Sequence, residues 1–264
     1  MKKYNVLIAS DLGTFIINRN DLGVGWQLSE YGIYDRVEMN YLKILMGILR
    51  SNRPNLIALD IGANIGMHSF LFSSQVGPLG QVYAFEAQRL VFNMLAGNMA
   101  INSINNVHCF HNAVSNERTF IDIPQFDYGK PLNIGSIEFG EKQKEGIGQD
   151  RIENQERQEQ VLTVVLDECT FDHVDIIKID VEGMEMKVLD GAKQLIKKCS
   201  PLMLIEYLKS DPAVLQEWLI KAGYTLYTGI GANYLCVPEH LGMKIGSDIG
   251  GLMKLTQNKG TSTT

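Results

Sequence analysis

Residues 56–69, which read LIALDIGANIGMHS, decide the fold. An apolar run containing Asp60 leads into a turn with Gly62 and Gly66, and an apolar helical segment follows to about Val76. A short apolar run, a glycine turn and a helix are typical of a buried parallel strand that enters a nucleotide-binding loop. The glycines permit positive φ and close approach of a ligand. The start of the helix offers free N–H groups to an anion.

The glycine spacing of this turn does not fit a dinucleotide. That fingerprint is G-x-G-x-x-G, which leaves bare backbone for a pyrophosphate, whereas Asn64 and Met67 stand where the second and third glycines would fall. A smaller anion, such as the carboxylate of an amino-acid-like cofactor, still fits the helix start. Asp60, at the strand end, suits an ammonium group. These groups predict a site for the methionine part of S-adenosylmethionine and disfavour an NAD-linked oxidoreductase.

The second half of the predicted site lies on the next strand. Residues 81–86 (QVYAFE) end in Glu86, 24 residues after Gly62. An acid at this place can accept both hydroxyls of a ribose. Alone, the turn could be an ordinary tight turn and the acid an exposed one. Their occurrence together at βαβ spacing favours cofactor binding.

Three motifs resemble those of the FkbM family of methyltransferases. They are residues 60–66 (DIGANIG), 82–86 (VYAFE) and 177–183 (IKIDVEG), and the resemblance covers about residues 21–238. The first motif is shared by many methyltransferases, whereas the third is more specific to this family. The resemblance implies a class I, S-adenosylmethionine-dependent fold that usually methylates oxygen atoms of sugars or natural products.

Strand-like and helix-like segments alternate along the chain, which predicts a doubly wound α/β sheet. We expect the class I methyltransferase (Rossmann-like) fold, with a mostly parallel seven-stranded sheet and an antiparallel last strand. A hairpin and helical cap is expected over residues 1–53 and the cofactor-binding domain over residues 54–255. The polar residues 140–160 predict a mobile loop or a lid that orders with substrate. Residues 256–264 predict a flexible tail.

Local patterns add further expectations. The glycines at 23, 25 and 32 predict a loop, residues 107–114 predict one strand, and residues 184–199 predict one helix. The resemblance places the N-terminal block over the cofactor. Tyr31, Asp35 and Glu38 could then face the ligand, with aromatic packing and a solvated helix start as the alternatives.

Polar residues are expected to meet at one rim of the sheet, because ligands gather at the carboxyl ends of its strands. Predicted strand ends carry Asp60, Glu86, Asn112, Asp180 and Glu206. The predicted cofactor-binding residues are Asp60, Gly62, Ala63, Asn64, Gly66, His68, Ser69, Glu86, Ala87, Asn112, Ala113 and Asp180. For His68, a place on the helix surface is the alternative.

The predicted catalytic residues are Asp180 and Glu182, which come directly before Gly183. Methyl transfer depends mainly on alignment of the acceptor, but a neutral hydroxyl must also lose its proton, which a carboxylate can take. The other interpretation is that Asp180 only contacts the cofactor and that Glu182 stabilises the start of the next helix. Lys178 shares side-chain parity with Asp180, and we expect it to pair with an acid.

No metal is expected, although Asp180, Glu182 and Glu206 could offer oxygen ligands to Mg²⁺. The N/D-P-P-Y/F turn that serves methylation of planar amines is replaced here by residues 180–183 (DVEG), which favours an oxygen acceptor. We therefore expect an S-adenosylmethionine-dependent O-methyltransferase for a hydroxyl on a sugar or natural-product-like small molecule. The alternative is an S-adenosylmethionine-binding regulatory or partner domain without transferase activity.

Composition restricts partners and compartment. A net charge of −6 and a pI near 5.4 argue against broad nucleic-acid binding. The four cysteines are scattered without a CxxC spacing, which predicts free thiols in a reducing compartment. No apolar run approaches the roughly 18 residues of a membrane span. We expect a cytoplasmic protein.

Overall fold

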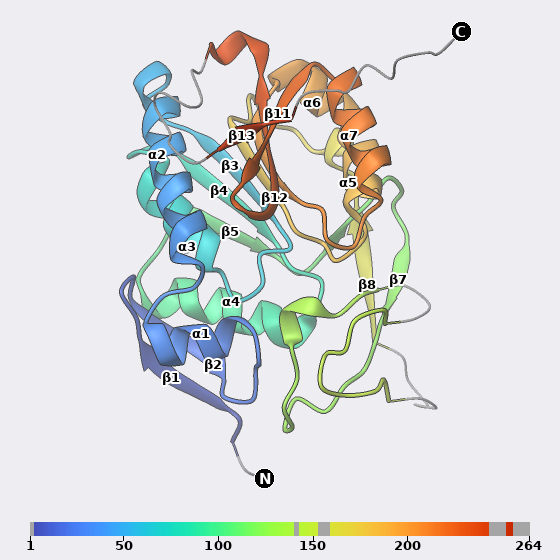
Figure 1. Ribbon diagram of the computed structural model, residues 1–264. Coiled ribbons are helices and arrows are strands. Elements are labelled where there is room, and N and C mark those ends of the chain that lie inside the picture. The colour runs from blue at the N-terminus through green and yellow to red at the C-terminus, as the bar shows by residue number, and fades with distance from the viewer. Residues whose placement is uncertain (1–2, 140–142, 153–158, 243–251, 256–264) are drawn as a thin grey trace, which may run out of the picture.

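The computed structural model of the chain describes residues 3–139, 143–152, 159–242 and 252–255. The strands of the main sheet are β3 (Ile57–Ile61), β4 (Gln81–Phe85), β5 (Val107–Phe110), β9 (Ile176–Ile179), β10 (Leu202–Glu206), β11 (Tyr224–Gly229), β12 (Gly231–Pro238) and β13 (Met253–Lys254). Their order is β13-β11-β12-β10-β9-β3-β4-β5 (Figure 1).

The sheet confirms the predicted fold class. Strands β10, β9, β3, β4 and β5 pair in parallel, while β12 lies antiparallel between β10 and β11. This is the predicted mostly parallel arrangement with an antiparallel last strand. The short β13 adds an eighth strand at the edge, antiparallel to β11.

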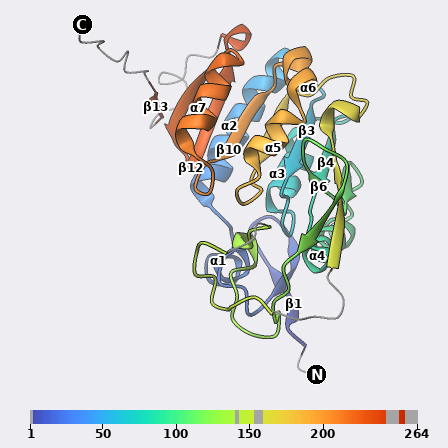
Figure 2. The same cartoon turned by 90° about the vertical axis from the view of Figure 1, so that its right-hand side faces the viewer.

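Helices cover both faces of the sheet. One face carries α2 (Arg36–Asn52), α3 (Met67–Gln75) and α4 (Arg89–Ile101), and the other carries α5 (Glu185–Asp190), α6 (Lys193–Cys199) and α7 (Pro212–Lys221). Successive residues of β3 point to opposite faces: Ala58 joins the core under α2 and α3, and Leu59 joins the core under α5 to α7. Figure 2 shows α5, α6 and α7 on the side toward the viewer.

The N-terminal block begins with the expected hairpin, β1 (Asn5–Ala9) and β2 (Thr14–Asn18). The expected loop after it is wrong, because α1 (Val24–Tyr31) is a helix. Gly23 precedes the first turn, Gly25 lies within that turn with its N–H donated to the Asp21 carboxylate at 2.7 Å, and Gly32 ends the helix in the left-handed region at φ 69°. Val24 and Leu28 bury the inner face of this helix.

Two other local expectations are wrong for reasons of tertiary contact. The expected strand over residues 107–114 stops at Phe110, and β6 (Ala113–Val114) joins a separate sheet with β7 (Phe120–Ile123) and β8 (Glu159–Val164). The expected helix over residues 184–199 divides into α5 and α6 around Gly191. A Cβ on Gly191 would lie 2.1 Å from the carbonyl oxygen of Ser115, so this close approach requires glycine.

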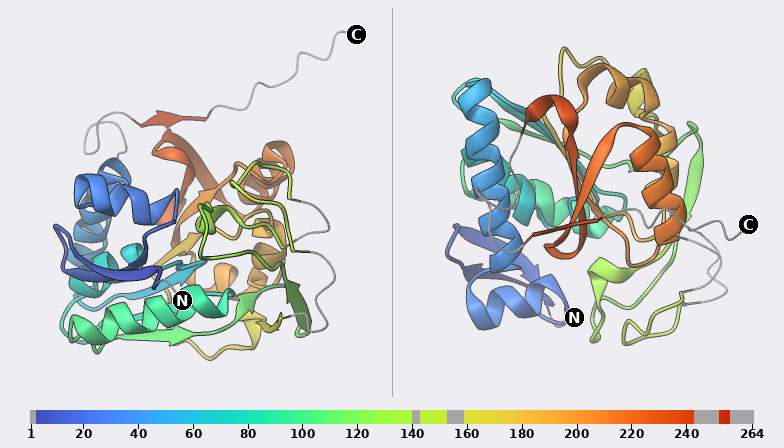
Figure 3. Two further views of the ribbon diagram at one scale, coloured as in Figure 1. Left: turned by 90° about the horizontal axis from the view of Figure 1, so that it is seen from below. Right: turned by 45° about the horizontal axis from the view of Figure 1, so that its top comes forward.

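The N-terminal block and residues 124–139 lie side by side at the carboxyl ends of the parallel strands (Figure 3). Asp21 forms a β-bridge with Leu132, and its carboxylate accepts the N–H of Ile134 at 3.2 Å. Short 3₁₀ turns occur at Ile134–Ser136, Leu166–Glu168 and Glu239–Leu241.

The expected polar loop is described in part. Ile147 is buried in the main core, and the Gln149 amide donates to the carbonyl oxygens of Asp127 and Pro131. The strand β8 already begins at Glu159. Residues 140–142, 153–158 and the expected tail 256–264 lie outside the described residues. Across the described part of the chain, no helix has the length and apolar character needed to cross a membrane.

Candidate active site

A cavity of about 770 Å³ lies at the carboxyl ends of β3, β4 and β9. This figure counts all the empty space of the cavity, part of which is open to solvent. Its wall contains these predicted cofactor-binding residues: Gly62, Ala63, Asn64, His68, Glu86, Ala87, Asn112, Ala113 and Asp180. Glu182 also lines the cavity, and Val24, Ile137 and Phe139 add apolar side chains from the two covering segments.

The turn after β3 is held against the segment after β9. Gly62 has φ 82°, and a Cβ there would lie 1.8 Å from the backbone oxygen of Asp180. Only glycine permits this contact. Gly66 starts α3 at φ 94°, and a Cβ there would meet the side chains of Leu95 and Met99. The two glycines therefore fix the shape of the turn on its inner side.

Glu86 is held by backbone donors from two directions. Its Oε2 accepts the N–H of Asn64 at 2.9 Å, and its Oε1 accepts the N–H of Gln88 at 2.8 Å. Burial raises the pKa of Glu86 to about 7 against these hydrogen bonds, and Asp60 and Asp180 raise it further. A carboxylate oxygen has two lone pairs. Each oxygen therefore keeps one acceptor position for a hydroxyl in the cavity.

Asp60, Gly66 and Ser69 lie behind the cavity wall. Asp60 is fully buried, and its Oδ2 accepts the hydroxyl of Ser69 at 2.5 Å. Its Oδ1 has no hydrogen-bond partner among the described residues. The structure thus brings Asp60 and Ser69 together in support of the turn, and a contact of Asp60 with an ammonium group stays a prediction.

Asp180 forms an ion pair with Lys178. The Lys178 Nζ lies 2.8 Å from Oδ2 of Asp180, and Lys178 is buried. Burial alone would lower the pKa of Lys178, but Asp180, Glu38 and Asp60 outweigh it and raise the pKa. The expected pairing of Lys178 with an acid is confirmed, and its partner Asp180 comes two positions later, directly after the end of β9.

Glu182 is bound to a lysine that the sequence did not suggest. The Lys209 Nζ lies 2.5 Å from Oε2 of Glu182 and donates to the carbonyl oxygen of Ser136 at 2.9 Å. Glu138 and Glu145 lie 4.0 and 3.5 Å from the same nitrogen. Burial, and then Asp180, raises the pKa of Glu182 to about 8. Lys209 follows β10 with no motif around it, so only the folded chain reveals this contact.

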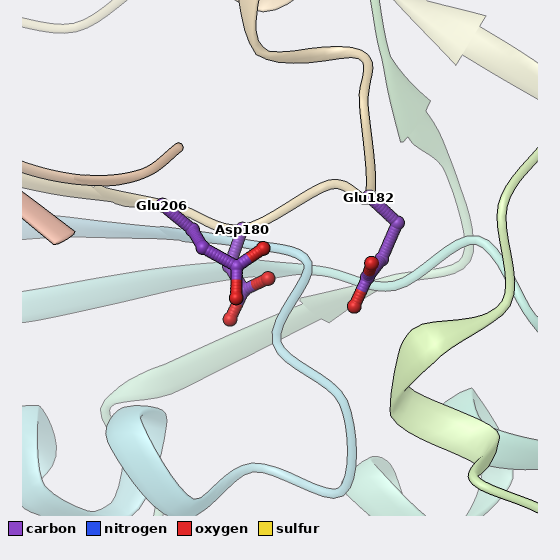
Figure 4. A group of neighbouring side chains, drawn as sticks. All are labelled: Asp180, Glu182 and Glu206. Carbon is purple, nitrogen blue, oxygen red and sulfur yellow. The ribbon is translucent and has the colours of Figure 1, made fainter. Parts of the chain in front are cut away.

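Asp180, Glu182 and Glu206 have carboxylate oxygens within 4.8 Å of one another. Figure 4 shows Asp180 and Glu206 close together, with Glu182 on the turn that follows Asp180. Burial, then Asp180 and Glu182, raises the pKa of Glu206 to about 9. Lysine ammonium groups already contact Asp180 and Glu182, so a divalent cation at this cluster would have to compete with them.

The N-terminal block contributes Tyr34 and Glu38. Tyr34 lines the cavity, and its ring meets that of His68 edge to face at 6.1 Å between centroids. Glu38 is buried with Oε1 2.6 Å from Nε2 of His68, so its helix start is not solvated. Tyr31 is exposed and Asp35 caps α2 instead. Sequence reasoning missed Tyr34, which no motif marks.

This sheet order is that of the class I, Rossmann-like methyltransferase fold. Residues 60–226 match the methyltransferase FkbM domain, and the chain belongs to this family. No curated protein matches the sequence.

Solved structures with related folds include several methyltransferases. Methyltransferase FkbM from Methylobacillus flagellatus is 15% identical, with a TM-score of 0.48, and the alignment covers 69% of this chain but 43% of that one. An rRNA methylase from Streptococcus thermophilus is 11% identical over 75% of this chain and 92% of its own, with a TM-score of 0.43. TYW2 from M. jannaschii, in complex with AdoMet, is 14% identical over 89% of this chain and 84% of its own, with a TM-score of 0.45.

Proposed function

We propose that this protein is an S-adenosylmethionine-dependent O-methyltransferase that acts on a hydroxyl of a sugar or natural-product-like small molecule. The observation that carries the proposal is a single cavity lined by Glu86, the start of α3 and Asp180. These groups suit a ribose, an amino-acid carboxylate and the reacting end of the cofactor, respectively. Family membership supports the same reaction class.

The residues present fit the cofactor. Glu86 keeps an acceptor position on each oxygen for the ribose hydroxyls, and it lines the same cavity as the turn after β3. Asn112, Ala113, Gly62, Ala63 and Asn64 all line the cavity, and we propose that the first two contact the adenine and the last three the methionine part. When bound, the cofactor supplies an electrophilic methyl group. The protein then has to align the acceptor and remove its proton.

For Asp180 and Glu182 the structure favours orienting roles. Asp180 lines the cavity with one oxygen on Lys178, which leaves its other oxygen free to orient the cofactor or the acceptor. Glu182 pairs with Lys209, which also contacts Ser136, Glu138 and Glu145 and so holds the segment around residues 136–139 against the sheet. We propose that this covering segment shapes the acceptor end of the cavity.

The apolar side chains that line the cavity on its N-terminal and 134–139 sides suit a small-molecule acceptor. Val24, Ile137 and Phe139 line it with apolar side chains, and the chain as a whole carries a net charge of −6. A nucleic-acid acceptor would call for a basic face. Because DVEG stands where amine-specific enzymes have a proline turn, oxygen is the proposed acceptor atom. The four free cysteines agree with work in a reducing compartment.

Two measurements test the proposal. Calorimetry should show binding of S-adenosylmethionine and S-adenosylhomocysteine but not of NAD. Incubation with methyl-tritiated S-adenosylmethionine and a small-metabolite extract should then yield a labelled product with one added CH₂. Binding without any transfer would support the regulatory alternative, and tighter binding of NAD would overturn both interpretations.

A further inference from the structure

His68 and Glu38 form a buried pair beside the cavity. Nε2 of His68 lies 2.6 Å from Oε1 of Glu38, and both side chains are less than one-tenth exposed. His68 comes from α3, directly after the glycine turn, and Glu38 comes from the first turn of α2. The two residues are 30 positions apart and belong to different parts of the fold.

Further contacts fix Glu38 in place. Its Oε2 accepts the side-chain amide of Asn233 at 2.8 Å, and its backbone N–H donates to the Asp35 carboxylate at 3.0 Å. Burial would raise the pKa of Glu38, but His68, Lys178 and Asn233 outweigh it and hold the pKa near 2. Glu38 is therefore an ionised acceptor at neutral pH. An ionised acceptor at Nε2 favours the tautomer with its proton on that nitrogen.

The other ring nitrogen of His68, Nδ1, does not contact Glu38 and remains available to a ligand in the cavity. His68 lines the cavity, and none of the hydrogen bonds found among the described residues involves its Nδ1. The Tyr34 ring packs edge to face on the imidazole, which limits its rotation. With Nε2 bound to Glu38, the unprotonated Nδ1 is a proton acceptor of fixed direction.

We propose that His68 is the general base of the methyl transfer and that Glu38 is its positioning residue. This inference rests on the proposed function, since it assigns the group that takes the acceptor proton. A carboxylate behind an imidazole holds its tautomer and stabilises the imidazolium that forms. Asp180 and Glu182 are weaker candidates because each already contacts a lysine ammonium group.

The proton and electron changes balance. The acceptor O–H bond breaks, and its proton moves to Nδ1 of His68. The oxygen electron pair forms the new O–CH₃ bond, while the methyl–sulfur pair returns to sulfur. The imidazolium, paired with Glu38, later releases its proton to water. No further reactant is needed.

Substitution of each member tests the assignment. For His68→Gln we expect methyl transfer to the metabolite extract to fall by about 10²–10⁴-fold, with the dissociation constant of S-adenosylhomocysteine changed less than about threefold. Glu38→Gln should lower transfer in the same direction but less, because the base remains. His108→Gln is the matched control, since His108 is exposed and bonds to Gln81 away from the cavity. Its transfer rate should equal that of the wild type.

A spectroscopic measurement on the wild type does not depend on activity or on the folding of variants. Two-bond ¹H–¹⁵N spectra should show neutral His68 protonated at Nε2 and not at Nδ1, which is the tautomer that leaves Nδ1 able to accept a proton. In the variant Asn233→Ala, the preference of His68 for the tautomer protonated at Nε2 should be weaker, because Glu38 loses the hydrogen bond that fixes its Oε2.

Several outcomes would overturn the inference. One is full transfer by His68→Gln; another is a tenfold or greater loss of S-adenosylhomocysteine affinity that accounts for the lost transfer, since His68 would then bind the cofactor. A neutral His68 protonated at Nδ1 would also exclude it as the base. If the proposed function itself is wrong, the result is different: the wild-type protein transfers no tritiated methyl group to the metabolite extract.

Discussion

Lys209 and Glu182 form an ion pair that joins three segments, with Nζ of Lys209 2.5 Å from Oε2 of Glu182. Lys209 follows β10 and Glu182 follows β9, while the carbonyl oxygen of Ser136 accepts from the same nitrogen. Both side chains are largely buried. The segment that covers the cavity is thus attached to the sheet through one ammonium group.

Removal of that ammonium group should destabilise the fold. In Lys209→Met, Glu182 loses its partner inside the protein, and breaking a buried pair from one side costs roughly 3 kcal/mol or more of the free energy of unfolding. Urea denaturation measures the loss. Lys221→Met is the control, because Lys221 pairs with Glu217 on the surface and its loss should change little. Equal effects of the two substitutions would contradict the role of Lys209.

The cofactor should depend on the charge of Glu86. Glu86→Gln keeps the shape of the side chain but removes the charge-assisted hydrogen bonds to the ribose, which should cost about 1.5–3 kcal/mol of S-adenosylmethionine binding. Calorimetry checks this value against Glu30→Gln, an exposed acid on α1. An unchanged dissociation constant in Glu86→Gln would mean that the ribose lies elsewhere.

Stability should fall as the pH rises from about 5 to 9. The pKa values of Glu86, Glu182 and Glu206 are raised in the folded protein to about 7, 8 and 9, from an ordinary value of 4.5. Between the unfolded and folded pKa values the folded state binds more protons, so increasing pH favours unfolding. Glu38 acts oppositely: its pKa is near 2, so the stability it adds is lost as the pH falls below about 4.5.

Melting temperatures across this pH range test the trend. Glu206→Gln should flatten the decline at high pH, because a group that binds a proton only in the folded state has been removed. Glu217→Gln, on an exposed helix surface, should leave the curve unchanged. A stability that is constant or increasing from pH 5 to 9 would refute the raised pKa values.

Gly62→Ala should lower the stability of the fold by more than the positive φ at this position alone would cost. The new Cβ would lie 1.8 Å from the backbone oxygen of Asp180, so the two segments must separate. Gly223→Ala is a matched control with φ 88° and no atom within 4 Å of the new Cβ. We expect about 1–3 kcal/mol for the control and more for Gly62→Ala. Equal losses of stability would show that φ alone matters.

Transfer should be independent of divalent metal. Lys178 and Lys209 already place positive charge on Asp180 and Glu182, although Glu206 completes a set of three neighbouring carboxylates. Excess EDTA should leave methyl transfer unchanged, and titration with MgCl₂ should give no binding heat. Binding of Mg²⁺ that disappears in Glu206→Gln would instead establish a metal site.

The parallel sheet could be predicted because β3, β4, β9 and β10 each carry their own signal, an apolar run that ends at a glycine or an acid. The site residues that end strands, Glu86 and Asp180, were predictable for the same reason. Tyr34 and Lys209 were not, since neither stands in a motif and both reach the cavity region through contacts between distant segments. The break at Gly191 likewise follows from the close approach of Ser115. Local pattern cannot encode such contacts.

The position of β12 has a consequence for the order of folding. It is inserted between β10 and β11, both of which precede it in the chain, and it carries Asn233, which binds Glu38 across 195 positions. Contacts this distant form slowly because long loops must close first. During synthesis, the first two hundred residues can assemble much of the sheet while the carboxylate behind His68 still lacks its amide donor. Completion of the pair therefore waits for nearly the whole of the described chain to leave the ribosome.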